Sequence, residues 1–168
     1  ENIQQLTQNN INYIVGARLG NIPAALLETI DKTIVREDGK SIRIKTDNGY
    51  LICSYSSVRY RKDRYEMEKQ IEKAKQVIAE PSKSKKMKFT QTKGQKIELN
   101  EALIEKTQKL LGIKGYYTNL EASVADNKMI IERYHELYKV EQAFRISKND
   151  LQTRPIFHFK EQPIKLHI

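Results

Sequence analysis

Residues 41–56, SIRIKTDNGYLICSYS, carry the clearest local structural signal in the chain. Ile42 and Ile44 alternate with polar residues, as expected for a half-exposed strand, and YLICSYS is rich in residue types that favour strands. Between the two runs stands Asn48-Gly49, a pair that supplies the positive φ angles of a two-residue turn. The sequence therefore predicts a β-hairpin here.

A second turn signal predicts one more strand before this hairpin. Asp38-Gly39 follows TIVRE at residues 33–37, a run that also favours strands. We therefore expect a three-stranded meander over residues 33–55.

The other predicted elements follow from apolar periodicity and from residues that start or stop helices. They are a helix at 2–9, a short buried strand at 12–19, a helix beginning near Pro23, a long helix at 58–80 ended by Pro81, a helix at 98–112 closed by Gly112, a strand at 115–118, and a final helix at 123–148, the longest uninterrupted helical pattern.

Residues 81–96, PSKSKKMKFTQTKGQK, contain lysines but no acidic residue. The lysines are Lys83, Lys85, Lys86, Lys88, Lys93 and Lys96. Like charges repel one another, so we expect a solvated connection, which either contacts DNA phosphates or serves only as a surface loop.

The composition limits the classes of protein and partner. The chain has 168 residues, 39% hydrophobic content and a net charge of +9, which suits one modest domain or part of a larger one and favours polyanionic partners. Nucleic acid is the first candidate and an anionic membrane surface the second. No run approaches the length of a membrane span, so a soluble intracellular protein is expected. The lone Cys53 is interpreted as a packed thiol.

One face of the final predicted helix combines apolar and ionisable residues. Spacings of three and four residues place the following on that face: Ile130, Tyr134, Leu137, Glu141, Phe144 and Lys148. A carboxylate in an apolar stripe requires a cation, hydrogen-bond donors or a proton. A divalent metal is one such partner for Glu141, and an ion pair with Arg145 one turn later is the other.

Tyr134, Glu141 and Lys148 stand seven residues apart, so in a continuous helix they form a row that rises about 10 Å per step. This spacing, Y-x2-L-x3-E-x6-K, resembles the signature Y-x2-R-x3-E-x6-K of DDE-type transposases in the insertion-sequence-four superfamily. The surrounding text, YHELYKVEQAFRISKNDLQTRPIFHF, looks like one branch of that superfamily. YIVGARL and SVRYRKDRYEMEKQIEKA extend the resemblance over nearly the whole chain.

The resemblance implies an α/β architecture, a partial ribonuclease-H-like fold with a β-rich and helical insertion before the helix that carries the catalytic Glu. Residues 1–32 and 113–168 would then be the C-terminal part of the catalytic domain. Residues 33–112 would be the insertion, comprising the meander, the long basic helix, the Lys-rich loop and another helix.

The resemblance also assigns roles to single residues. Glu141 would be the third catalytic acid and a ligand of two Mg²⁺ ions, while Tyr134 and Lys148 would contact DNA phosphates near the cut site. Arg145 and Arg154 are further DNA-binding candidates because they are basic and close to the motif, and the alternative for Arg154, which precedes Pro155, is a structural ion pair. Leu137 departs from the Arg of the wider superfamily, which puts that Arg's contact in doubt here.

No Asp in the chain stands in the context of the family's first two catalytic acids, and both ends look cut. We therefore expect a transposase fragment that is inactive alone and comes from a bacterial, cytoplasmic, nucleoid-associated protein. Its partners would be double-stranded transposon-end and target DNA and a second protomer on DNA, with no membrane. The alternatives are a non-catalytic DNA-binding module, using the helix at 58–80 and the lysine loop, and a ribonuclease-H-like nuclease.

Overall fold

The computed structural model describes residues 2–47, 49–79, 87–93 and 96–149. The chain divides into two compact units, residues 1–131 and 132–168. Its elements are α1 (Asn2–Gln8), β1 (Ile14–Ala17), η1 (Leu19–Asn21), α2 (Ala24–Thr33), β2 (Ser41–Thr46), β3 (Gly49–Tyr55), α3 (Ser57–Ala79), β4 (Thr90–Lys93), β5 (Lys96–Leu99), α4 (Glu101–Lys109), β6 (Ile113–Thr118), α5 (Asn127–His135) and α6 (Leu137–Asn149). The predicted mixture of helices and strands is confirmed.

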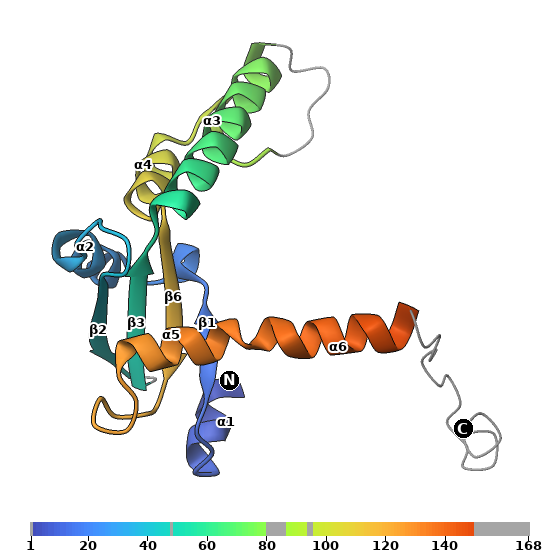
Figure 1. Cartoon of the computed structure of the whole chain (residues 1–168). Coiled ribbons are helices and arrows are strands. Elements are labelled where there is room, and N and C mark those ends of the chain that lie inside the picture. Colours follow the sequence, from blue (N-terminus) through green and yellow to red (C-terminus); the bar gives the residue numbers. More distant parts are fainter. Residues whose placement is uncertain (1, 48, 80–86, 94–95, 150–168) are drawn as a thin grey trace. The chain divides into compact units, whose positions relative to one another are not determined.

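A four-stranded sheet forms the centre of the first unit (Figure 1), with strand order β1-β6-β3-β2. Every pairing in it is antiparallel. Strand β6 is paired on both sides, and its register places Tyr116 opposite Ile52 of β3. Both side chains are buried, so strands far apart in the sequence pack against each other on one face of the sheet.

The predicted hairpin at β2–β3 is confirmed. Thr46 faces Gly49 in the register, which leaves a two-residue turn; Asn48 of the predicted pair lies outside the described residues. Gly49 has a φ of +89°, and a Cβ there would come 2.4 Å from the Thr118 backbone oxygen. Glycine is required at this position both by the turn and by the close approach of β6.

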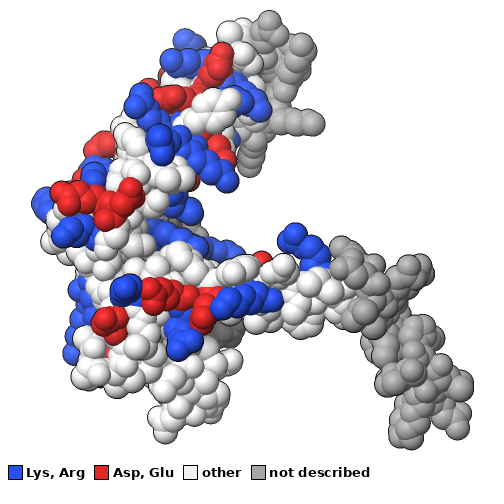
Figure 2. All heavy atoms as spheres, in the orientation of Figure 1, with Lys and Arg blue, Asp and Glu red and all other residues white. Residues whose placement is uncertain are grey.

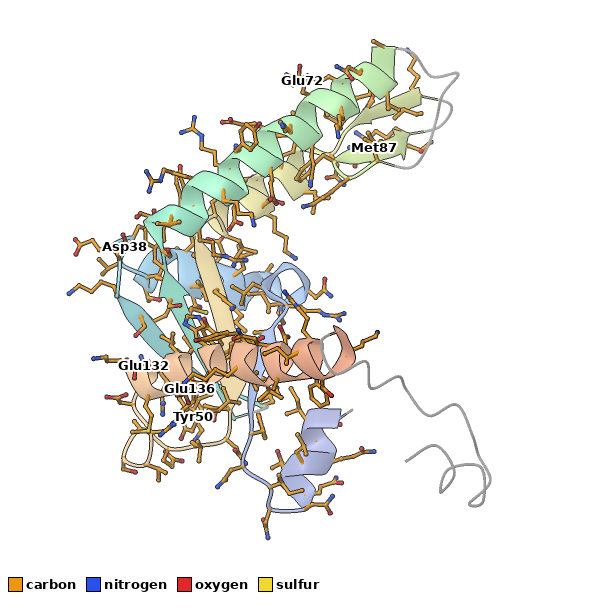
Figure 3. The ribbon with its side chains drawn as sticks, turned by 45° about the vertical axis from the view of Figure 1, so that its right-hand side comes forward. Asp38, Tyr50, Glu72, Met87, Glu132 and Glu136 are labelled. Atoms are coloured by element: carbon orange, nitrogen blue, oxygen red, sulfur yellow. The ribbon has the colours of Figure 1, made fainter. Side chains whose placement is uncertain are left out.

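The predicted first strand of the meander is wrong. Helix α2 runs to Thr33, the first residue of that run, because its apolar residues Leu27 and Ile30 bury against the sheet, and Ile34 directly after the helix packs into the same core without forming a strand. Asp38 instead binds the start of α3, as Figure 3 shows. The Ser57 backbone N–H donates to Asp38 Oδ1 at 2.6 Å, and the Ser57 hydroxyl donates to Oδ2 at 2.5 Å.

The first hydrophobic core lies between α2 and one face of the sheet. Ile30, Leu51 and Cys53 are fully buried in it. Each fully buried Ile or Leu side chain stabilises the fold by about 1.5–3 kcal/mol. Burial also raises the pKa of the Cys53 thiol to about 12, which confirms the prediction of a packed thiol.

A second core joins α3, α4 and the small sheet β4–β5. Phe89, inside the stretch predicted to be a solvated connection, is completely buried there. The prediction of a solvated connection is therefore wrong for Phe89, which is buried, and for the backbone of Thr90–Lys93, which forms β4. The side chains of Lys88 and Lys93 are exposed as expected, and Lys83, Lys85 and Lys86 lie outside the described residues. Helix α4 begins three residues later than predicted, since Glu98 and Leu99 belong to β5.

A clamp at Arg43 of β2 holds the segment between β6 and α5. Its Nε donates to Asn127 Oδ1 at 3.0 Å, Nη1 to the Leu120 carbonyl at 3.2 Å and Nη2 to the Ala125 carbonyl at 2.6 Å. The guanidinium also lies 5.3 Å from the centre of the Tyr50 ring. One side chain thus fixes a stretch of backbone that has few regular hydrogen bonds of its own.

The prediction of one uninterrupted helix over residues 123–148 is wrong. A turn at Glu136 separates α5 from α6, and α5 begins only at Asn127. At the break the Lys139 backbone N–H donates to the Glu136 carbonyl, a three-residue step in place of the usual four. The longest described helix is α3, with 23 residues.

The first compact unit, residues 1–131, extends across both of the predicted domain limits, which lie at 32/33 and 112/113. The hairpin β2–β3 of the predicted insertion shares a sheet with β1 and β6. The division into two compact units falls instead at residues 131/132, near the end of α5. Whether residues 33–112 are an insertion in a larger catalytic domain stays a prediction.

Candidate functional site

Helix α6 presents Glu141 to solvent. Its apolar residues are exposed as well, among them Leu137 at 48% and Phe144 at 72%. The part of the predicted apolar stripe that lies on α6 is therefore present around the carboxylate. The expectation that Glu141 points into a cleft stays a prediction.

The alternative partner of Glu141 does not engage it. Among the residues that the structure describes, no ion pair joins Glu141 to Arg145. The acid that does pair is Glu136, which binds Arg133 at 2.9 Å and Lys139 at 3.3 Å. Hydrogen bonds from these two cations lower the pKa of Glu136. The Glu141 carboxylate is thus left available for another partner.

The three residues of the predicted row belong to two helices. Tyr134 lies half-buried on α5, whereas Glu141 and Lys148 lie exposed on α6, seven residues apart. In one helix that spacing places the ammonium about 10 Å along the axis from the carboxylate. The described structure thus keeps the Glu–Lys part of the row within one continuous helix.

The remaining candidates divide between described and undescribed residues. Arg145 lies exposed on α6 between Glu141 and Lys148, and Leu137 is the exposed first residue of that helix. Arg154 lies outside the described residues. Helix α6 therefore presents one acid, three bases and an apolar stripe to solvent, the bases being Lys139, Arg145 and Lys148.

A complete metal site is not present in the described part of the chain. No group of three or more His, Cys, Asp or Glu residues there is arranged to hold a metal ion. Mg²⁺ is commonly held by one or two carboxylates together with water and phosphate oxygens. Glu141 fits as one such ligand, and further carboxylate ligands would have to come from outside the described residues.

The sequence analysis missed a pocket of about 290 Å³ within the first unit, which we call the α3 pocket. One face of α3 lines it with Arg59, Asp63, Glu66 and Gln70, and Lys114 of β6 lies opposite. The four α3 residues are spaced four, three and four apart, so helical periodicity could have identified a polar face. The contribution of Lys114, 44 residues after Gln70, has no local signal.

Comparison with known proteins gives no match: no family model, curated protein or solved structure resembles the chain significantly. Among the described helices, none is long and apolar enough to cross a membrane.

Proposed function

We propose that this chain is the C-terminal part of a DDE-type transposase catalytic domain with a ribonuclease-H-like fold, and that Glu141 is its third catalytic acid. The observation that carries the proposal is the state of Glu141: an exposed carboxylate in an apolar stripe, without an ion pair among the described residues. It occurs within the motif Y-x2-L-x3-E-x6-K, where the family places a metal-binding acid. An ion pair with Arg145 would have explained Glu141 as a structural residue that needs no metal.

The proposed chemistry uses Glu141 as one metal ligand and the neighbouring residues as phosphate contacts. Two Mg²⁺ ions would supply charge stabilisation for the attacking and leaving oxygens of the phosphodiester. Lys148 provides an ammonium one heptad after the acid, and Arg145 a guanidinium between them, both exposed on α6. Tyr134 offers a phenol from α5, so its contact depends on the geometry of the turn at Glu136. Such contacts position the DNA backbone relative to the acid.

A DNA partner also agrees with the distribution of charge. Helix α3 carries seven basic and four acidic residues, and Figure 2 shows these side chains interspersed over its surface. Together with the net charge of +9, this favours a polyanion over an acidic or neutral partner. In this proposal the complete transposase acts as a homodimer on double-stranded DNA in the bacterial cytoplasm. This chain alone is inactive because two catalytic acids are missing.

The test is Mg²⁺-dependent DNA binding by the chain and two variants. We expect Mg²⁺ to strengthen binding of a short duplex, because the carboxylate and a DNA phosphate can share the ion. Glu141→Gln should lose this response while keeping the metal-free affinity. Lys148→Ala should weaken binding with or without metal and reduce the salt slope by about one.

Glu132→Gln is the matched control, since it removes an exposed carboxylate from the end of α5 (Figure 3). Its Mg²⁺ response should equal that of the unmodified chain. A full Mg²⁺ response in Glu141→Gln contradicts the metal role, and absence of DNA binding contradicts the whole proposal. Mg²⁺-dependent DNA cleavage by this chain, lost in Glu141→Ala, would contradict the statement that it is inactive alone and favour the nuclease alternative.

A second candidate function is a non-catalytic DNA-binding module built on α3. The observation in its favour is that the first two turns present Arg59, Arg61, Lys62 and Arg64, all exposed. In that case, Arg61→Gln with Lys62→Gln should abolish most DNA binding, whereas Glu141→Gln should leave both the affinity and its Mg²⁺ response unchanged.

A further inference from the structure

Helix α3 has one face packed against the second core and another in solvent. Tyr60, Met67, Ile71 and Ala74 lie on the packed face. An α-helix has about 3.6 residues per turn, so side chains three, four or seven residues apart share a face. On the side away from the core these spacings bring together four exposed residues, which we call the α3 outer row: Lys62, Tyr65, Lys69 and Lys73.

The three lysines of the outer row form no ion pair with another residue among those that the structure describes. Two arginines on the flanks of the same helix differ in this respect. Arg59 pairs with Asp63 at 3.3 Å, and Arg64 pairs with Glu68 at 2.8 Å. Pairing one turn apart is a common role of charged residues on a helix surface. The lysines of the row lack this role, so their charges are available to an external anion.

Two acids stand at the borders of the outer row but not in it. Glu66 lines the α3 pocket on one side, and Glu72 projects into solvent on the other (Figure 3). Neither is ion-paired to a lysine of the row within the described residues. The row therefore carries three positive charges and no negative charge over about three helical turns.

Tyr65 adds an aromatic ring and a hydroxyl group to the row. It is 58% exposed, and the Lys69 ammonium nitrogen lies 4.4 Å from the centre of its ring. This cation–π contact holds a long side chain in one orientation before a ligand arrives, which reduces the entropy lost on binding. The hydroxyl group is able to donate a hydrogen bond to a phosphate oxygen. The two residues therefore form a partly ordered contact point for an anion.

The row is long and straight enough to meet a regular array of negative charges. A rise of about 1.5 Å per residue places Lys62 and Lys69 about 10 Å apart along the helix axis, and Lys69 and Lys73 about 6 Å apart. Double-stranded DNA carries about one negative charge per 1.7 Å of its axis, so several phosphates lie within the roughly 16 Å that the row spans. Lysine side chains are flexible, so they do not need an exact match to the phosphate spacing.

Two other anionic partners fit the row less well. A helix that binds a membrane surface inserts its apolar face into the lipid, but the apolar face of α3 is packed in the second core. Single-stranded nucleic acid is bound in a groove whose aromatic side chains stack on successive bases. The row has one aromatic residue, and it lies on the convex surface of a helix. These differences favour double-stranded nucleic acid, contacted through its phosphates.

We propose that the α3 outer row binds the phosphate backbone of double-stranded nucleic acid without regard to base sequence. The ammonium groups of the three lysines and the Tyr65 hydroxyl donate hydrogen bonds to phosphate oxygens, contacts that position a duplex but do not read its bases. The choice of DNA as partner rests on the proposed function, but binding by the row requires neither Glu141 nor Mg²⁺. It differs from a module built on the first two turns, where Arg59 and Arg64 are already paired with acids.

Binding of a short duplex to the whole chain without metal, followed by fluorescence anisotropy at several salt concentrations, tests the proposal. Replacing all three lysines of the row by Gln should weaken binding about tenfold or more at low salt. It should also reduce the salt slope by about 2.7, since each lost phosphate contact contributes about 0.9.

The matched control replaces Lys32, Lys45 and Lys75 by Gln. These lysines are also exposed and lie on α2, on β2 and on α3 outside the row, so both variants lose the same three charges. The control should bind nearly as tightly as the unmodified chain, and circular dichroism should show that both variants fold. Equal losses in the two variants would mean that affinity follows net charge alone. No loss in the outer-row variant would mean that the duplex binds elsewhere, and either result overturns the proposal.

The response to Mg²⁺ separates the outer row from the proposed metal site. The outer-row variant should still bind more tightly when Mg²⁺ is added, because Glu141 is unchanged. A weakened outer-row variant together with a full Mg²⁺ response in Glu141→Gln supports the row and contradicts the metal role. Unchanged binding by the outer-row variant, with the Mg²⁺ response lost in Glu141→Gln, contradicts the row alone.

Other ligands test the kind of partner. Two duplexes of equal length and different base composition should bind with similar affinity, and a single strand of the same length should bind more weakly. Vesicles of anionic lipid should not distinguish the outer-row variant from the control. A strong preference for one duplex contradicts backbone recognition, and tighter binding of the single strand contradicts a duplex partner. Vesicle binding that is lost only in the outer-row variant, with duplex binding intact, would overturn the proposal and assign the row to a membrane surface.

Discussion

Asp38 shows how one carboxylate can join two elements at the scale of a single residue. It precedes the hairpin in sequence, yet it accepts hydrogen bonds from both the backbone N–H and the hydroxyl of Ser57 at the start of α3. An acid at a helix N-terminus satisfies a free N–H group and also interacts favourably with the helix dipole. The hydrogen bonds from Ser57 lower the pKa of Asp38 below its usual value of 3.8.

This cap makes stability depend on pH in a defined direction. A group whose pKa is lower in the folded state stabilises the fold above its unfolded-state pKa, here 3.8, and loses that contribution as the pH falls through the folded-state value. We expect Asp38→Asn to lower the urea midpoint at neutral pH and the difference from the unmodified chain to shrink below pH 3.8. Urea unfolding followed by circular dichroism at several pH values measures this.

Asp47→Asn is the control for that experiment, because Asp47 is an exposed aspartate in the β2–β3 turn. Its urea midpoint should stay close to that of the unmodified chain at every pH. A midpoint for Asp38→Asn that differs by the same amount at all pH values would show that the cap does not act through its charge.

At the scale of elements, the Arg43 clamp shows how the loop between β6 and α5 is held. Arg43→Met should destabilise the chain by about 1–3 kcal/mol, because the Leu120 and Ala125 carbonyls lose their donors. Arg43→Lys should restore little of this, since one ammonium cannot reproduce three divergent hydrogen bonds. Chemical denaturation measures the loss, with Lys45→Met on the same strand as the control. A rescue by Lys would indicate that charge alone matters.

Elements with local signals were predictable from the sequence, and those determined by tertiary contacts were not. Asn48-Gly49 identified the hairpin, and Pro23 the start of α2, because turn and helix-start chemistry is local. The extra strand at 33–37 was wrong because α2 includes Thr33 and the next residue, Ile34, packs with Ile30 in the core under the sheet. The many lysines around Phe89 predict a solvated connection. Phe89 itself is buried in the second core, and this single side chain fixes the stretch against α3 and α4.

In the candidate site, too, the features set by local spacing were predictable from the sequence and those set by tertiary contacts were not. The helix face that contains Glu141 and Lys148 follows from spacing and is present on α6. The break at Glu136 was not predictable, since the apolar periodicity runs through it without Gly or Pro. The α3 pocket depends on β6 meeting α3, a contact between residues far apart in the sequence. No pattern within one segment contains that information.

At the scale of the whole molecule, the two compact units differ in what stabilises them. The first unit contains two hydrophobic cores and a sheet in which β6 is paired on both sides. The described part of the second unit is the end of α5 and α6, whose apolar residues Leu137, Val140 and Phe144 are exposed. A helix of 13 residues is by itself only marginally stable in water.

This difference predicts unequal hydrogen exchange. The amides of β6 should exchange slowly, at a rate set by global unfolding, whereas those of α6 should exchange within seconds to minutes, since the described part of the second unit has no hydrophobic core of its own. Exchange followed by mass spectrometry on the isolated chain measures both segments in one sample. The end of α2, which is packed against the sheet, provides a protected helical control. Protection of α6 equal to that of α2 would mean that its apolar stripe is covered in solution, by the chain itself or by a second copy. Comparing dilute with concentrated samples separates these two cases, because only a second copy makes the protection depend on concentration.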